Sequence, residues 1–207
     1  MKKKFLSIGV ILLSFFSVRA QTEFGLKAGV NCASYSYGDT QQLVDAKPRA
    51  SFYLAGYLDA PIAKNIYIQP EFSLQGKGAK LIEGINSGGG EINQRVMWLD
   101  VAVNLLGKMP LDNFGNVFVG AGPYMGFAIN GENDYASGTT TSVIIYQDNA
   151  LKSVDYGLNF STGMKFGKRL FFNVNYRMGL ANIANKNYKW SDTIKNRVFS
   201  VGVGVML

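Results

Sequence analysis

The residues most suited to chemistry are eight charged side chains on the polar faces of alternating segments described below. Four are cations and four are anions: Lys27, Asp59, Glu71, Lys77, Asp100, Asp155, Lys165 and Arg177. Because an unpaired charge is costly to bury, equal numbers of opposite sign in one interior predict ion pairs, first of all Arg177 with Glu71. The pattern favours a structural salt-bridge core. It leaves open a proton or ion path, or a plug that rearranges on binding.

Histidine is absent from the 207 residues, and there is one cysteine. Hydrolysis by a Ser–His pair is therefore excluded, together with histidine metal sites. A single cysteine, Cys32, can form neither an internal disulfide nor a zinc cluster. The sequence thus predicts no catalytic residues, no metal and no cofactor.

Three further motifs carry little chemical signal. The glycines of residues 120–126 are spaced wrongly for a dinucleotide loop and fall within a predicted strand, where they indicate packing. Residues 87–90 (SGGG) suggest a flexible loop tip. Glu132 and Asp134 could offer oxygen ligands to calcium, but isolated loop acids are usually solvated.

Alternation with a period of two residues dominates the chain and predicts strands. In residues 66–77, Ile68, Phe72 and Leu74 share one face, whereas Gln69 and Glu71 share the other. The same reading applies to eight segments: 24–32, 52–60, 66–77, 97–105, 117–127, 155–166, 170–180 and 199–207. Each is about as long as the ~9–11 residues that a tilted transmembrane strand needs.

The connections between these segments alternate strictly between short and long. Short ones are expected at 63–65, 110–115 and 167–169, and long polar ones at 36–48, 79–91, 130–150 and 184–193. Outer-membrane barrels have this arrangement, with short periplasmic turns and longer external loops. We therefore predict an all-β fold, an eight-stranded antiparallel up-and-down transmembrane β-barrel, with both termini periplasmic.

A soluble barrel would show the same period with the opposite orientation of its faces. The polar faces here are rich in glycine, which suits the narrow interior of an eight-stranded barrel. The apolar faces carry no charge on any of the eight segments. These features favour the membrane barrel over a soluble periplasmic barrel that binds a small ligand.

Residues 1–20 have the pattern of a cleaved signal peptide: three lysines, an apolar run, and Val18 and Ala20 before the expected cleavage site. The mature barrel domain is then 21–207. Removing the signal lowers the Lys and Arg count from 21 to 17 against 14 acidic residues, and the net charge from +7 to +3. The basic balance therefore gives no indication of nucleic-acid binding.

Several short motifs lie at the expected cleavage site and along the predicted strands: Ala20-Gln21, 24–31 (FGLKAGVN), 68–72 (IQPEF), 120–124 (GAGPY), 176–180 (YRMGL) and 200–204 (SVGVG). Together they resemble the motifs of the PorT-like outer-membrane β-barrel proteins of Bacteroidetes. The resemblance covers residues 20–207 and implies a small barrel of the OmpA and OmpX type. One departure is the last residue, Leu207, where such barrels commonly end in an aromatic.

These patterns favour a non-enzymatic barrel embedded in outer-membrane lipid, with a structural or interaction role or as an accessory to secretion or envelope machinery. Aromatic residues in or near the long loops offer contact surface or form an interfacial girdle: Tyr35, Tyr37, Tyr135, Tyr146, Tyr188 and Trp190. A narrow pore or transporter for small solutes is the alternative, although eight strands leave little lumen.

Overall fold

The computed structural model describes residues 22–38, 44–83, 90–111, 115–135, 140–142, 151–167, 169–185 and 192–207. These residues form strands connected by turns and loops. The ten strands are β1 (Glu23–Tyr37), β2 (Val44–Lys47), β3 (Arg49–Ala63), β4 (Ile66–Glu83), β5 (Glu91–Leu111), β6 (Gly115–Tyr135), β7 (Thr140–Ser142), β8 (Val154–Phe166), β9 (Leu170–Gly179) and β10 (Ile194–Met206). No helix in the described part of the chain is long and apolar enough to cross a membrane.

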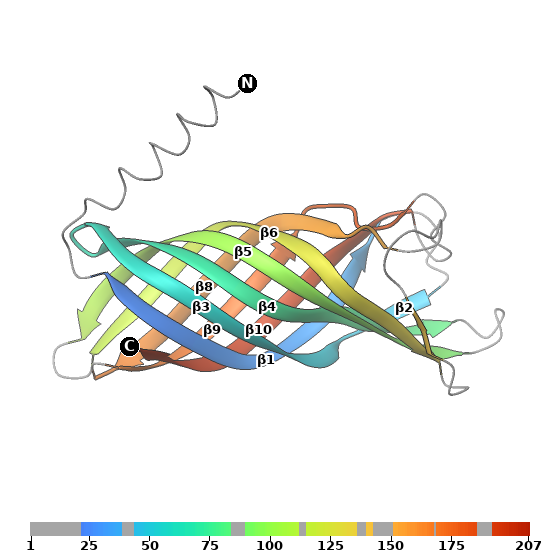
Figure 1. The fold of residues 1–207 in the computed structure, drawn as a ribbon, viewed down its shortest axis with the longest axis horizontal. Coiled ribbons are helices and arrows are strands. Elements are labelled where there is room, and N and C mark those ends of the chain that lie inside the picture. Colours follow the sequence, from blue (N-terminus) through green and yellow to red (C-terminus); the bar gives the residue numbers. More distant parts are fainter. Residues whose placement is uncertain are drawn as a thin grey trace, which may run out of the picture.

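Eight of the strands close into an antiparallel ring (Figure 1). Each pairs with its neighbours in the order β1, β3, β4, β5, β6, β8, β9 and β10, and β10 returns to β1 over thirteen residue pairs. The predicted eight-stranded up-and-down barrel is therefore confirmed. The two short strands lie outside the ring: β2 extends the pairing of β4, and β7 that of β6.

The two faces of the wall differ in the sense expected for a membrane. Large apolar side chains point outward, among them Phe24, Phe72 and Val203, which is 65% exposed. Polar and charged side chains such as Lys27, Glu71 and Asn159 point inward and are buried. A soluble barrel would have the reverse arrangement. Cys32 is on the outer face of β1, and Leu207 keeps the outward phase.

The short connections lie at one end of the molecule, together with the start of β1 and the end of β10 (Figure 1). We call this end the turn end. The turn between β3 and β4 contains Asn65 in the left-handed conformation, with φ 62°. The amide of Leu207 donates to the carbonyl of Phe24, which joins the last residue to the first strand. The strand ends that the longer connections join lie at the opposite end, which we call the loop end.

Strands β4, β5 and β6 reach further toward the loop end than predicted. Loops had been expected over 79–91 and 130–150, but β4 continues to Glu83, β5 begins at Glu91 and β6 continues to Tyr135. The reason is that the polarity of the two faces inverts there. Ala79 and Leu81 are fully buried, whereas Lys80 is partly exposed. Beyond the lipid the outer face meets water, so the apolar side chains turn inward.

Glycine is required where interior tyrosines lie against the wall. A Cβ on Gly202 of β10 would overlap the hydroxyl of Tyr53 and the carbonyl oxygen of Ala28. We expect Gly202→Ala to lower the free energy of unfolding by about 1–3 kcal/mol, since overpacking displaces a buried side chain.

Urea unfolding of the refolded barrel measures this effect. Gly56→Ala is the matched control, because a Cβ there meets only Leu26 Cδ2, at 3.7 Å. We expect this control to change the free energy of unfolding by less than about 0.5 kcal/mol. Equal effects of the two variants would contradict the close packing of Tyr53 on Gly202.

Candidate functional site

The inward-facing residues of β5 show how the barrel interior is organised. From the loop end they are apolar at Ile92 and Val96, charged at Asp100, uncharged polar at Asn104 and charged again at Lys108. These five are buried, and so are the other inward-facing residues of the strand, Gln94, Trp98, Ala102 and Leu106. The interior therefore consists of an apolar level, a central charged level, an amide level and a charged mouth at the turn end.

Six of the predicted residues form one chain of contacts across the barrel, which we call the central network: Lys27, Glu71, Arg177, Asp100, Lys77 and Asp155. Lys27 Nζ is 2.6 Å from Glu71 Oε2, and Arg177 Nη2 is 2.6 Å from Glu71 Oε1. Arg177 Nε is 3.7 Å from Asp100 Oδ2. Lys77 Nζ closes the chain, 3.0 Å from Asp100 and 3.1 Å from Asp155.

The central network contains three cations and three anions, so it is formally neutral. Its members come from β1, β4, β5, β8 and β9. The expected contact between Arg177 and Glu71 is present at 2.6 Å. Buried charges are tolerated only with partners and hydrogen bonds, and here every charge has at least one partner of opposite sign.

Lys77 is the most enclosed cation of the described interior, with a side chain that is 0% exposed. Its ammonium group lies over two aromatic rings, 4.9 Å from the centroid of Trp98 and 4.7 Å from that of Tyr124. The hydroxyl of Tyr124 and the amide of Asn196 both donate to Asp155 at 2.9 Å. The lysine is thus held by two carboxylates and two π-faces.

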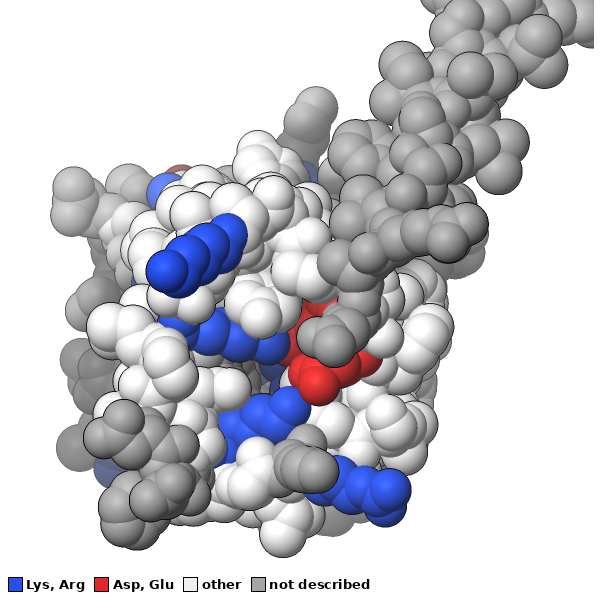
Figure 2. Space-filling model, turned by 90° about the vertical axis from the view of Figure 1, so that its left-hand side faces the viewer, with Lys and Arg blue, Asp and Glu red and all other residues white. Residues whose placement is uncertain are grey.

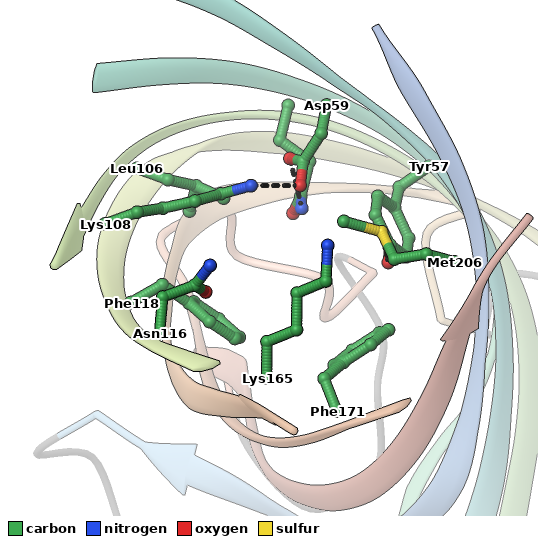
Figure 3. Close-up of a pocket in the computed structure, with 10 residues that line it drawn as sticks. Tyr57, Asp59, Leu106, Lys108, Asn116, Phe118, Lys165, Phe171 and Met206 are labelled. Carbon is green, nitrogen blue, oxygen red and sulfur yellow. Dashed lines mark hydrogen bonds and ion pairs between the residues drawn. The ribbon is translucent and has the colours of Figure 1, made fainter. Parts of the chain in front are cut away.

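The remaining two predicted residues, Asp59 and Lys165, lie apart from this network at the turn end. Lys108 Nζ is 2.6 Å from Asp59 Oδ2, and Gln69 donates to the other carboxylate oxygen at 2.9 Å. Lys165 is 3.2 Å from Glu23. We call these residues the mouth cluster: Glu23, Asp59, Gln69, Lys108 and Lys165. Figure 3 shows Lys108 reaching Asp59 across the mouth, while Lys165 points into the cavity.

Figure 2 looks onto the turn end, where several basic side chains lie beside a group of acidic ones. A cavity of about 20 Å³ lies at the mouth. It is lined by four members of the mouth cluster, Asp59, Gln69, Lys108 and Lys165, and by residues that include Tyr57, Phe118 and Phe171. Phe171 packs edge-to-face against the other two rings, with centroids 5.7 and 6.4 Å apart. Such a volume holds about one water molecule.

The loop-end half of the interior is filled by an apolar cluster that the sequence did not indicate. Its buried members are Tyr35, Ala79, Leu81, Ile92, Val96, Trp98, Leu151, Ala181, Ile183, Ala184 and Ile194. Tyr35 had been assigned to contact surface or an interfacial girdle; that is wrong, because it is only 6% exposed inside the barrel. Tyr37 and Tyr135 pack against the same cluster. Tyr146, Tyr188 and Trp190 lie outside the described residues.

Two charged residues of the mouth cluster, Glu23 and Lys108, were missing from the predicted set of eight charges. Both have the inward phase of their strands, two positions from Gly25 and Leu106. The predicted segments began at residue 24 and ended at residue 105, although the alternation continues to Glu23 and to Lys108. Extending both segments by the same period would have found them.

The weaker motifs have simpler roles. Glu132 and Asp134, considered for calcium, both pair with Arg95, at 3.0 and 2.7 Å. Within the described ranges no group of three or more acids and cysteines is placed to hold a metal ion. Gly120 and Gly122 lie in strand β6 against the backbone of β5, in agreement with a packing role. Residues 87–89 of the glycine-rich loop lie outside the described part of the structure.

A closed antiparallel barrel with an apolar outer surface and a charge-paired interior is the architecture of outer-membrane proteins. The family described as outer membrane protein beta-barrel domain matches residues 18–185, and the chain belongs to this family. Its location is the outer membrane.

Three solved structures are similar to this chain at low sequence identity. Neisserial surface protein A (NspA) aligns with a TM-score of 0.51 and 11% identity over 91% of this chain and 99% of its own. OprG from Pseudomonas aeruginosa gives 0.49 and 13%, over 89% and 95% of the two chains. Ail of Yersinia pestis gives 0.47 and 12%, over 91% and 100%. No curated protein matches the chain significantly. The likeness to NspA supports the fold alone.

Proposed function

We propose that this protein is a closed, non-enzymatic outer-membrane barrel with a structural or interaction role. The observation that carries the proposal is the filled interior: a neutral central network lies between the apolar cluster and the mouth cluster. The absence of histidine from the whole sequence supports a role without acid–base catalysis. Function then belongs to the ends of the barrel and to the partners that they contact.

The loop end is the better candidate for such contacts. Strands β4, β5 and β6 project there beyond the apolar belt, and β2 and β7 pair with the outer two of them. We take this end to face outward and the termini to be periplasmic, after removal of residues 1–20 as a signal peptide. We include in the proposed interaction role an accessory function in secretion or envelope machinery.

A narrow pore is the second candidate, because the central network places six charged groups across the barrel. It would conduct only if these pairs separated and the apolar cluster moved aside. Eight strands otherwise leave room for side chains alone.

Single-channel recording in a planar bilayer distinguishes the two candidates. We expect the refolded wild-type barrel to give no stable conductance steps, since the interior is filled at every level. Persistent steps at moderate voltage would contradict the closed barrel and support the pore. Circular dichroism and heat-dependent mobility on a gel must first show that the inserted protein is folded.

Cross-linking in intact envelopes tests the interaction role directly. The chain is tagged and expressed in its native host, cross-linked at the surface, and purified under denaturing conditions. We expect one or a few envelope proteins to be captured reproducibly. Capture that is equal with an unrelated eight-stranded barrel would argue against a specific partner and favour a purely structural role.

A further inference from the structure

The outer wall has a groove where strands β3 and β4 separate near the loop end. Their ladder stops at Tyr53 and Gln75, and pairing with β4 resumes only at Lys47 and Lys80 of β2 and β4. From inside, the amide of Asn31 bridges the separation by donating to the carbonyls of Phe52 and Gly76. The resulting groove has a volume of about 350 Å³.

Both glycine and a strand irregularity shape this groove. Gly76 lines the groove, where a Cβ would overlap Oγ of Ser51. Two residues further along β4, Gly78 has φ +134°, and the register between β5 and β6 shifts at Met97 and Trp98. We call this cavity the outer groove; the residues that line it include Arg49, Phe52, Gly76, Arg95, Met97 and Glu132.

Two guanidinium groups line the outer groove. Arg95 is well exposed and pairs with Glu132 and Asp134. Arg49 is half-buried and forms no ion pair with any described residue, while it is repelled by the charge of Arg95 and attracted by that of Asp134. Exposed ion pairs contribute little, so Arg95 can share its donors with an incoming anion. Arginine is suited to this because its planar fork binds phosphate bidentately.

The groove lies where the apolar belt of the barrel ends. Phe52 on β3 and Phe127 and Ile129 on β6 are about half exposed and belong to the belt. Arg95 and Glu132 are the first charged residues beyond it on β5 and β6. This is the depth at which lipid acyl chains give way to headgroups, and basic sites at that depth attract anionic lipids.

We propose that the outer groove binds the phosphate group of a phosphorylated lipid in the outer leaflet. Arg49 and Arg95 hold the phosphate, and the acyl chains run along Phe52 and Met97 toward the belt. The assignment to the outer leaflet rests on the orientation proposed above, whereas the phosphate site itself does not. The carboxylate of Glu132 repels the phosphate, so removing this charge should strengthen lipid binding, whereas removing either arginine should weaken it.

The test uses the full-length mature barrel in neutral detergent, titrated with phosphatidic acid and followed by native mass spectrometry. Diacylglycerol with the same chains, and inorganic phosphate, are the comparison probes. We expect phosphatidic acid to bind much more tightly than either. Arg49→Gln should weaken its binding about fivefold, and Arg95→Gln by at least as much. Glu132→Gln should strengthen it.

Lys80→Gln is the matched control, because Lys80 is an exposed cation at the same end that pairs with Glu91 outside the groove. An equal loss in this control would overturn the proposal in favour of general charge attraction. Equal binding of phosphatidic acid and diacylglycerol would overturn phosphate recognition, and equal binding of inorganic phosphate would overturn the lipid as ligand.

Each variant is checked for heat-dependent gel mobility, and Arg95→Gln and Glu132→Gln decide the outcome if Arg49→Gln does not fold. Because this titration is independent of conductance and of partner capture, its failure is distinguishable from failure of the proposed function.

Discussion

Replacing Glu71 with glutamine is expected to lower the free energy of unfolding of the barrel by about 3–5 kcal/mol. Glu71 is the shared partner of Lys27 and Arg177, each 2.6 Å away, and its side chain is 1% exposed. Glutamine keeps the shape but removes the charge. Two buried cations then lose their closest anion, and Lys27 has no other ion-pair partner among the described residues.

Urea unfolding in lipid vesicles, followed by tryptophan fluorescence and gel mobility, measures this loss. Glu91→Gln is the matched control, since Glu91 pairs with Lys80 in a solvent-exposed position. We expect a change of less than about 1 kcal/mol there. A Glu71→Gln barrel that unfolds like the wild type but conducts very differently would contradict the structural role and favour an ion path.

The fold could be predicted from the sequence because the lipid imposes a simple rule on each membrane-spanning strand. Between Gln69 and Gln75, for example, Phe72 and Leu74 point outward whereas Glu71 and Ser73 point inward, so the period gives both the strand and its phase. The rule fails where a strand leaves the lipid. At Leu81 and Ile92 the apolar residues face inward, and the sequence alternation alone does not show where this inversion occurs.

Eight charged residues were predicted to share one interior, but Glu23, Lys108 and the division of the charges into two groups were not predicted. Phase places Lys165 and Lys77 on the same inner face, yet Lys165 lies at the mouth with Glu23 and Lys77 lies deep in the barrel. The height of a residue depends on strand tilt and register, which are properties of pairs of strands. The alternation in a single sequence indicates which face of a strand a residue lies on, but it does not indicate the register between neighbouring strands.

The outer groove was not predictable for the same reason. It depends on the separation of β3 from β4 and on a register shift between β5 and β6. Gly76 and Gly78 gave a local signal, since glycine inside a strand often marks a bulge. Their combination with Arg49, distant in sequence, required the folded barrel.

A second large effect is expected for Lys77→Met, which removes the cation between Asp100 and Asp155. Methionine is of similar length and apolar, so the space stays filled while two buried carboxylates face each other without Lys77. We expect a loss of about 3–5 kcal/mol in the free energy of unfolding. Arg177, 3.7 Å from Asp100, and the hydrogen bonds of Asp155 from Tyr124 and Asn196 prevent a larger loss.

Adding Asp155→Asn to this variant should restore about 1–3 kcal/mol, because it removes one of the two uncompensated charges. In the wild type, by contrast, Asp155→Asn alone should destabilise the barrel, since it takes a partner from Lys77. This reversal of sign is the signature of direct coupling between Lys77 and Asp155, and a double-mutant cycle from urea unfolding measures it. The exposed pair Lys80→Met and Glu91→Gln serves as the control cycle, with an expected coupling below about 1 kcal/mol. Additive effects at Lys77 and Asp155 would show that the central network does not act as one unit, and cation conductance in a stable Lys77→Met barrel would assign it to transport.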